Sequence, residues 1–486
     1  MPLQKRTGAL DGGLNELSIA RNETDLLICE NHDIEPESFT AQLERPALRR
    51  GAATRSIAPL PAARVTVKLI VAADAVAATV ASLGDLGADI ISQGPQVILA
   101  DVPPDNLPAL EAIAGLKRAE YSRRLQFRMD QARGAATRTD LALGQHPTIR
   151  GDNVVVGIVD SGVDWRHGDF HNADGTSRME MFMHAVQQNG ADTFTEFSNA
   201  DIDRALNGIG NVPQGDLNGH GTHCASIATG NGSTLADARY RGVAPNATLM
   251  GVRTDTLHDT HTIEGIRRIF ERSGDRPAVI NLSLGGHIGA HDGTSALENV
   301  IAQESGAGRI IVAAAGNEGG DRIHFDGELV QGADLDIEFT IRDDLQFIDV
   351  WIPRDDEVNI TIIDPNAIET EPDGSVQQTN AGAFRADLRV DQFNGDVNLF
   401  FAIAGNQLGR RWRIRLQAVS VQQGHVHAWG HTRNANFARN IFMTETSPRY
   451  SIGMPATEER AIAVGAWVSR AEIAPGGVTP PGLVTG

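Results

Sequence analysis

Two polar residues of this 486-residue chain stand at positions where side chains often do chemistry. Asp160 closes the apolar segment VVVGIVDSG, and His220 lies between two glycines in NGHGTHCASIATG. A buried carboxylate can orient an imidazole and stabilise its protonated form, as a general base requires. Taken singly, such an aspartate is more often a turn or helix-capping residue, and such a histidine usually has no special role.

A candidate nucleophile is found in HDGTSALEN, where Ser295 opens an expected helix. Many hydrolases present a serine in this way. The alternative is that Thr294 or Ser295 caps the helix and that Glu298 completes a capping box.

The elements that would position these residues are apolar strands alternating with helices over 148–322, the pattern of a parallel sheet covered on both faces. The expected buried strands are NVVVGIVDSG, ATLMGVRT, PAVINLSLGG and GRIIVAAAGNEGG, joined later by AIAVGAWV. In open α/β sheets, ligand chemistry gathers at the carboxyl ends of the strands. Asp160, Ser283 and Asn317 all stand at such ends.

Two further patterns flank and interrupt this sheet. Residues 63–125 follow a strand-helix-strand-strand-helix-strand order, which predicts a small ferredoxin-like domain. Short alternating strands separated by Gly, Asn, Asp and Pro predict an antiparallel β-sandwich over 323–445. The expected organisation is an irregular extension (1–62), the ferredoxin-like domain (63–125), a linker (126–147), the α/β domain (148–322 and 446–486) and the inserted sandwich (323–445).

Six motifs, in the order VDSG, GHGTHCAS, GVAP, NLSLGG, AAAGNEG and AVGAW, resemble the subtilisin-like serine peptidases, or subtilases. The resemblance covers 154–320 and 446–467, and the inserted sandwich is similar to that of the Csp-type subgroup. It implies that Asp160 is the acid of an Asp-His-Ser triad, that His220 is the general base and that Asn317 donates to the oxyanion. It also implies that Ser283, Leu284 and Gly285 pair with an extended polypeptide substrate.

The resemblance assigns other residues as well. His223 is structural in the family, and Cys224 resembles the thiol of the branch that includes proteinase K, although a small buried hydrophobic residue is the more common use of such a cysteine. Asp169 matches a position that binds structural calcium in many subtilases. No cofactor is expected for catalysis, and no residue is assigned as a metal ligand.

In the subtilase order the catalytic serine follows the AVGAW strand, whereas Ser295 precedes Asn317, so Ser295 is expected to be only a helix cap. No later Gly-Thr-Ser motif occurs in the sequence. The chain as printed is therefore expected to lack the nucleophile and to be inactive. The parent protein is expected to be a serine endopeptidase, with an inactive subtilase-like binding protein or one half of a split enzyme as the alternatives.

The resemblance also makes 63–125 a propeptide-type domain that inhibits the peptidase within the same chain until it is cut off in 126–147. The alternative is an unrelated ferredoxin-like binding module. HVHAWGH places His425, His427 and His431 at alternating positions, which could hold zinc on one strand face. No cysteine or carboxylate partner is evident in the sequence, so an exposed strand is the expected interpretation.

Composition excludes several other functions. A formal net charge of −20 argues against binding to nucleic acid or to an anionic membrane surface. No apolar run is long enough to span a membrane, and no secretory signal is evident, which slightly favours the cytoplasm. The two cysteines, Cys29 and Cys224, are too few for a disulfide framework.

Overall fold

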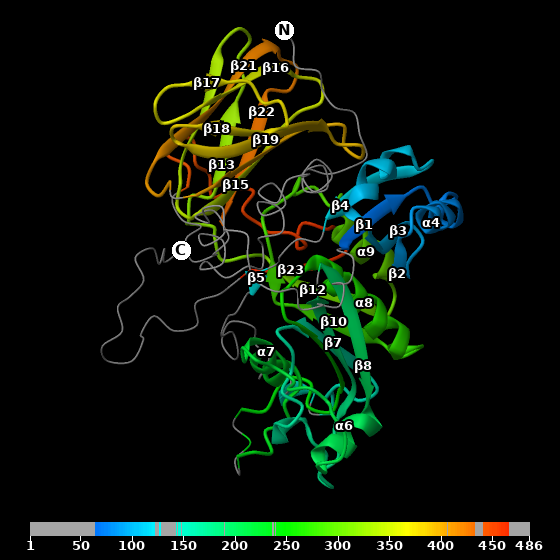
Figure 1. Cartoon of the computed structure of the whole chain (residues 1–486). Coiled ribbons are helices and arrows are strands. Elements are labelled where there is room, and N and C mark those ends of the chain that lie inside the picture. The colour runs from blue at the N-terminus through cyan, green and yellow to red at the C-terminus, as the bar shows by residue number, and fades with distance from the viewer. Residues whose placement is uncertain are drawn as a thin grey trace, which may run out of the picture. The chain divides into compact units, whose positions relative to one another are not determined.

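The structure is a computed structural model that describes residues 64–121, 126–127, 142, 144–146, 148–188, 190–235, 238, 240–405, 407–432 and 441–465. The predicted extension 1–62, which includes Cys29, and most of the predicted linker lie outside the described residues. The chain divides into two compact units (Figure 1). Unit 1 takes in the described parts of 1–124, 187–192 and 321–447, and unit 2 takes in those of 125–186, 193–320 and 448–486.

The first part of unit 1 is a four-stranded sheet with the strand order β2-β3-β1-β4. This is the order of a ferredoxin-like sheet, as the alternation of strands and helices predicts. The second predicted helix is a 3-10 helix, η1, rather than an α-helix, and Pro108 lies inside it, where it has no N–H to donate. The elements are β1 (Val65–Val71), α4 (Val76–Asp85), β2 (Asp89–Gln93), β3 (Val97–Val102), η1 (Pro104–Ala112) and β4 (Leu116–Tyr121).

The second part of unit 1 is a β-sandwich, in which a six-stranded sheet, β13-β22-β15-β20-β19-β18, and a four-stranded sheet, β14-β21-β16-β17, share one apolar core. Alternate residues of the longer strands enter this core, for example Val426 and Ala428 of β22. The strands are β13 (His324–Glu328), β14 (Asp334–Thr340), β15 (Leu345–Ile352), β16 (Glu357–Ile363), β17 (Glu369–Thr370), β18 (Val376–Thr379), β19 (Gly382–Val390), β20 (Val397–Ala404), β21 (Arg411–Ser420) and β22 (His425–Thr432).

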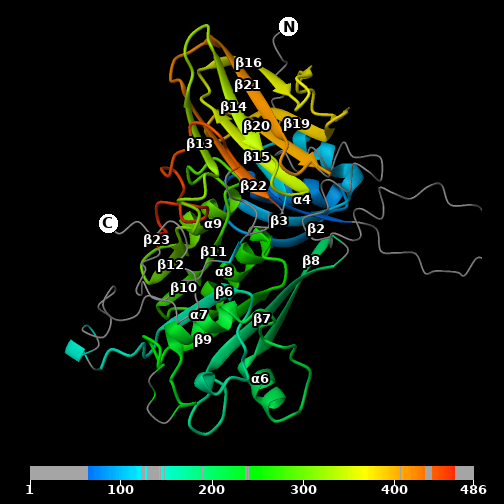
Figure 2. The same ribbon diagram turned by 90° about the vertical axis from the view of Figure 1, so that its left-hand side faces the viewer.

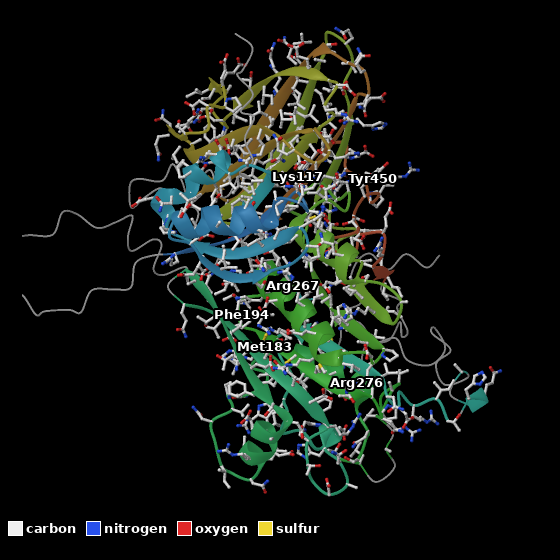
Figure 3. The ribbon with its side chains drawn as sticks, turned by 90° about the vertical axis from the view of Figure 1, so that its right-hand side faces the viewer. Lys117, Met183, Phe194, Arg267, Arg276 and Tyr450 are labelled. Carbon is white, nitrogen blue, oxygen red and sulfur yellow. The ribbon has the colours of Figure 1, made fainter. Side chains whose placement is uncertain are left out.

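Unit 2 is built on a seven-stranded sheet with the order β23-β12-β10-β6-β9-β7-β8, whose strands from β23 to β7 run parallel (Figure 2). Figure 3 labels Met183 on β7 and Phe194 on β8, the two neighbouring strands at one edge. The strands are β6 (Val155–Asp160), β7 (Met179–Gln188), β8 (Ala191–Ser198), β9 (Thr248–Thr254), β10 (Ala278–Leu282), β12 (Arg309–Ala314) and β23 (Ile462–Val464).

Helices cover both faces of this sheet, because the strands are apolar on both sides. Val156 and Ile158 of β6 pack in one cluster with Ala225 of α7. On the opposite face, α8 approaches Gly157 so closely that an added Cβ would lie 2.7 Å from Ile269. The remaining elements of unit 2 are β5 (Gln126–Phe127), η2 (Gly168–Phe170), α6 (Asn199–Leu206), α7 (His220–Thr229), α8 (Asp259–Ser273), β11 (Leu284–Gly285) and α9 (Ala296–Glu304).

No helix among the described residues is long and apolar enough to cross a membrane.

Candidate active site

Asp160 and His220, 60 residues apart in the sequence, meet at the carboxyl end of β6. Asp160 is the last residue of β6 and His220 is the first residue of α7. Nδ1 of His220 donates to Oδ1 of Asp160 at 2.6 Å, and both side chains are almost completely buried. This is the imidazole–carboxylate pairing that a general base needs.

Two glycines allow α7 to begin so close to β6. Gly219 has a φ of +90°, a left-handed conformation that favours glycine. A Cβ on Gly221 would lie 2.0 Å from the carbonyl oxygen of Gly162 and 2.8 Å from Cβ of Asp160. The glycines on either side of His220 are therefore needed for the approach of the two side chains.

The environment of the pair changes the pKa of each group. Burial, the largest single effect, lowers the pKa of His220, but the hydrogen bond to the Asp160 carboxylate, the charge of that carboxylate and the interaction with Cys224 together outweigh it, so that the pKa of the imidazole is raised. Burial raises the pKa of Asp160, and its hydrogen bonds with His220 and the backbone N–H of Ser161 oppose that effect. A carboxylate and an imidazole this close titrate as a pair, and the protonated imidazole is the state that the site stabilises.

Asp216 is a positioning residue that the sequence reasoning missed. Its carboxylate accepts hydrogen bonds from the backbone N–H groups of Asn218, Gly219 and Thr222, and from the Thr222 hydroxyl. It also accepts from the Ser161 hydroxyl, which in turn accepts from the N–H of Gly221. Asp216 thus holds the loop before α7 against the end of β6. The sequence feature that could have identified it is a carboxylate four residues before His220.

Ser283 and Asn317, also predicted site residues, follow β10 and β12 at the same edge of the sheet as Asp160. Because β10 lies between β6 and β12 and adjacent strands are about 4.8 Å apart, the ends of β6 and β12 are about 10 Å apart. Asn317 is exposed, and its backbone N–H donates to Oε2 of Glu318 at 2.9 Å. Asn317 therefore follows the carboxyl end of β12, at the end of the sheet where Asp160 and His220 meet.

Leu284 and Gly285 form the short strand β11, which pairs antiparallel with β5, with Leu284 opposite Phe127 and Gly285 opposite Gln126. On the side of β11 opposite to β5, the next residue, Gly286, exchanges two backbone hydrogen bonds with Met454. A Cβ on Gly285 would lie 2.7 Å from the carbonyl oxygen of Met454, so this position requires glycine. One edge of β11 is therefore paired with an extended segment of the same chain, β5, and pairing of 283–285 with a substrate stays a prediction.

Glu318 and His287 form a second imidazole–carboxylate pair in unit 2. Nε2 of His287 lies 3.1 Å from Oε2 of Glu318, the oxygen that also accepts from the N–H of Asn317. His287 is buried and stacks on His291 with 5.4 Å between the ring centroids. The pair links the segment after β11 to the segment after β12 and so fixes the position of Asn317 relative to the β11 strand.

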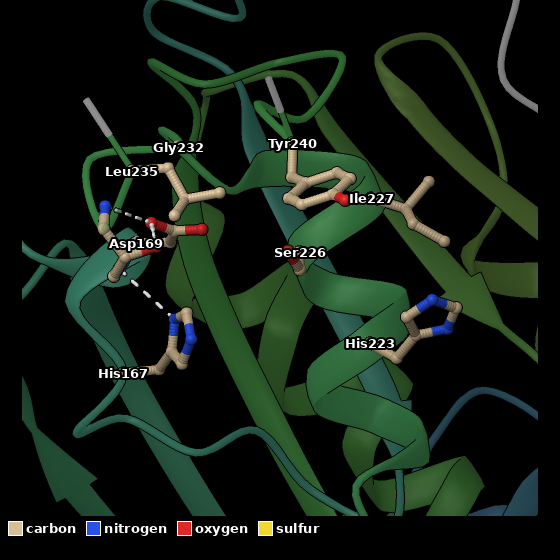
Figure 4. A pocket seen from close by; sticks show the side chains of 9 residues that line it. His167, Asp169, His223, Ser226, Ile227, Gly232, Leu235 and Tyr240 are labelled. Carbon is tan, nitrogen blue, oxygen red and sulfur yellow. Dashed lines mark hydrogen bonds between the residues drawn. The ribbon is translucent and has the colours of Figure 1, made fainter. Parts of the chain in front are cut away.

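Residues of α7 border a cavity of about 340 Å³, shown in Figure 4. Its lining includes His223 from α7, together with His167, Asp169, Thr234 and Leu235. Oδ1 of Asp169 accepts hydrogen bonds from the N–H and the hydroxyl of Thr234. The lining holds one carboxylate together with imidazole, hydroxyl and apolar side chains. Calcium prefers six to eight oxygen ligands, and structural calcium at Asp169 stays a prediction.

Cys224 lies one helical turn after the candidate base, with Sγ 3.9 Å from Nδ1 of His220. The side chain is half-buried, and Cys224 is a free cysteine. The structure therefore places the thiol beside the imidazole, as the resemblance implies.

Ser295 is the N-cap of α9. Its hydroxyl accepts from the N–H of Glu298, and the Glu298 carboxylate accepts from the N–H of Ser295, which completes a capping box. Glu298 also bonds to the hydroxyl of Thr457. The predicted capping role is confirmed: Ser295 bonds to Glu298 and Asn299, which belong to the helix rather than to the Asp160–His220 pair.

Comparison with known proteins agrees with this geometry. Residues 151–335 match the model of the Subtilase family. The serine protease AprX of Bacillus subtilis is 28% identical over 235 residues, which cover 46% of each chain. Thermitase of Thermoactinomyces vulgaris is 38% identical over 106 residues, which cover 21% of this chain and 35% of thermitase. The chain thus spans less than half the length of these curated relatives.

Among solved structures, the CspB protease of Clostridium perfringens aligns with 67% of this chain and 71% of its own, with a TM-score of 0.57 and 26% identity. The family match and the CspB likeness together give the chain a subtilase fold with added antiparallel sheets. Residues 151–335 are therefore the part of the chain that matches the subtilase family, and these likenesses support a subtilisin-like serine peptidase.

Proposed function

We propose that this chain is part of a serine endopeptidase that cleaves extended polypeptides with an Asp-His-Ser triad. Asp160 and His220 supply two members, and the third is a serine outside the 486 printed residues. The observation that carries the proposal is the buried 2.6 Å hydrogen bond between Nδ1 of His220 and Asp160.

In the proposed reaction, Nε2 of His220 removes the hydroxyl proton as the serine oxygen bonds to the carbonyl carbon of the scissile peptide. Asp160 stabilises the imidazolium that results, and Asn317 donates its side-chain N–H to the tetrahedral oxyanion. His220 then gives its proton to the amine nitrogen as the peptide C–N bond breaks. The backbone of 283–285 aligns the substrate through strand pairing.

A fluorophosphonate probe, which reacts with activated serines, tests this proposal. We expect the 486-residue chain alone to remain unlabelled and the parent protein to be labelled at a serine beyond it, with labelling lost in His220→Ala. Ser295→Ala should leave labelling of the parent unchanged and lower the free energy of unfolding by about 1 kcal/mol, because it removes a helix cap.

Labelling of the 486-residue chain itself at one of its own serines would contradict the proposal. If the coding DNA stops at codon 486 and no second polypeptide is labelled, the inactive subtilase-like binding protein is favoured instead. A labelled second polypeptide would favour the split enzyme.

We further propose that the ferredoxin-like domain inhibits the peptidase within the chain and that self-cleavage falls in 126–147. Support comes from β5, which follows this domain in the sequence and pairs with β11 at the edge proposed for substrate. A segment already paired with β11 excludes any other extended peptide from that edge.

N-terminal sequencing of the mature, active protein tests this expectation. We expect the sequence to begin within 126–147, and His220→Ala should leave the chain uncut because cleavage depends on the peptidase itself. Active protein that still begins at Met1 would contradict it.

A further inference from the structure

The face of the six-stranded sheet that points away from the sandwich core brings two histidines and an aspartate together. β13 and β22 pair antiparallel, with Asp326 opposite His427 and Glu328 opposite His425. Successive side chains of a strand alternate between faces, and Val426 and Ala428 enter the core, so His425 and His427 lie on the other face. Oδ1 of Asp326 lies 3.9 Å from Nδ1 of His425 and 3.8 Å from Nδ1 of His427.

We propose that Asp326, His425 and His427 bind a divalent transition-metal ion of the zinc class. Two imidazole nitrogens and one carboxylate oxygen are donors that zinc accepts, and a water molecule can complete a tetrahedral shell. The three donor atoms lie within 4.8 Å of one another. In a tetrahedral zinc site with bonds of about 2.0–2.1 Å, ligand atoms are roughly 3.3 Å apart. Each imidazole nitrogen therefore needs to approach the Asp326 oxygen by about half an ångström, and the two imidazole nitrogens, at most 4.8 Å apart, need to approach each other by no more than about 1.5 Å.

The site is open on one side, which allows an ion to enter and the ligands to adjust. The His425 side chain is 67% exposed, whereas those of Asp326 and His427 are 25% and 22% exposed. His425 can thus rotate toward the two better-fixed donors without disturbing the core.

His324 orients the ring of His427. Nδ1 of His324 lies 3.3 Å from the carbonyl oxygen of Ser447, which can only accept, so this nitrogen carries a proton. Nε2 of the same ring lies 3.1 Å from Nδ1 of His427, and Trp429 stacks on His324 with 5.0 Å between the centroids. A metal ion on Nδ1 of His427 displaces the proton of this hydrogen bond to solvent, and Nε2 of His324, whose lone pair then faces the ion, is a candidate fourth ligand in place of water.

The group of donors in the structure differs from the histidine group predicted from the sequence: Asp326 takes the place of His431. His431 is buried, stacks on Phe347 at 6.3 Å and is not among the clustered donor atoms. Asp326, supplied by β13, is the carboxylate partner that the sequence of β22 alone does not contain.

Titration of the metal-stripped 486-residue chain with Co²⁺ tests the proposal through the visible absorption of cobalt in a low-symmetry protein site. The titration is done in the Cys224→Ser background, because Asp160, His220 and Cys224 form another group of clustered donors. We expect Asp326→Asn and His425→Ala each to weaken one equivalent of Co²⁺ binding by at least tenfold, and Zn²⁺ to displace that equivalent.

The matched control is His184→Ala, which removes a histidine that also faces a carboxylate, with 3.1 Å between His184 and Asp255. This variant should bind as many equivalents of Co²⁺ as the parent, with the same affinity. Because His425 is exposed, His425→Ala leaves the core intact and decides the matter even if Asp326→Asn unfolds. Unchanged number and affinity of Co²⁺ ions in His425→Ala would overturn the proposal.

Discussion

Asp160→Asn is expected to lower kcat/KM of the parent peptidase by about 10⁴-fold, the loss known for triad aspartates, including that of subtilisin itself. An amide in place of the carboxylate carries no charge to stabilise the imidazolium, and it can hold His220 in the wrong tautomer. The hydrogen bond of 2.6 Å and the complete burial of Asp160 are the reasons to expect a loss of this size.

The same variant has a readout that does not depend on the nucleophile. In the wild-type chain the Asp160 carboxylate raises the pKa of His220 above the ordinary value, although burial lowers it. Without that charge, burial, the largest of the effects, is opposed only by Cys224, and the pKa of His220 should fall. An NMR titration of the 486-residue chain measures this, with His220→Ala to assign the signal.

The pH dependence of activity follows from the same shift. A general base works in its neutral form, so the rate rises with pH as His220 loses its proton. Because the pKa of His220 is raised, the acidic limb of kcat/KM in the wild-type parent should lie above pH 6.5. Asp255→Asn, which breaks the His184–Asp255 pair, is the matched control and should leave both the limb and the His220 signal in place. A His220 pKa that is the same in Asp160→Asn and wild type would contradict the assigned role of Asp160.

The Asp160–His220 pair could be predicted because the order of six motifs resembles the subtilases; taken singly, neither residue type indicated a catalytic role. Two local features agree with the pairing. The apolar run before Asp160 indicates a buried parallel strand, and the glycines around His220 indicate a close approach. Both features depend only on residues next to Asp160 and His220 in the sequence, and the structure contains the buried strand and the close approach that they indicate. The capping role of Ser295 was predictable for the same reason, since its partner is three residues away.

The features that the sequence did not reveal depend on contacts between distant segments. β13 lies within the sequence IHFDGEL, which was not predicted to be a strand. In the structure it pairs with β22, whose residues are about 100 positions away in the sequence. The carboxylate partner of His425 and His427 therefore could not be found from β22. Asp216 was missed because its many backbone hydrogen bonds exist only once the loop before α7 has folded.

Arg118→Ala is expected to lower the free energy of unfolding of unit 1 by about 3–5 kcal/mol, the range for breaking a buried ion pair. Arg118, on β4 of the ferredoxin-like domain, lies 2.8 Å from Asp391 of the sandwich, and their side chains are only 8% and 5% exposed. Its guanidinium also lies over the ring of Phe393, 4.7 Å from the centroid. Removing the arginine leaves the carboxylate of Asp391 buried without its cation.

Urea unfolding followed by tryptophan fluorescence measures this effect, since Trp351, Trp412 and Trp429 all lie in the sandwich. Lys117→Ala is the matched control: it removes the neighbouring cation of β4, which is exposed and lies 5.8 Å from the same Phe393 ring. That variant should lower the free energy of unfolding by less than about 1 kcal/mol.

In the double variant Arg118→Met, Asp391→Asn, most of the lost stability should return, because neither buried charge remains. Equal losses in Arg118→Ala and Lys117→Ala would show that the ion pair does not join the ferredoxin-like domain to the sandwich. A larger loss confined to Arg118→Ala, restored in the double variant, would instead mean that the sandwich anchors the domain proposed to inhibit the peptidase.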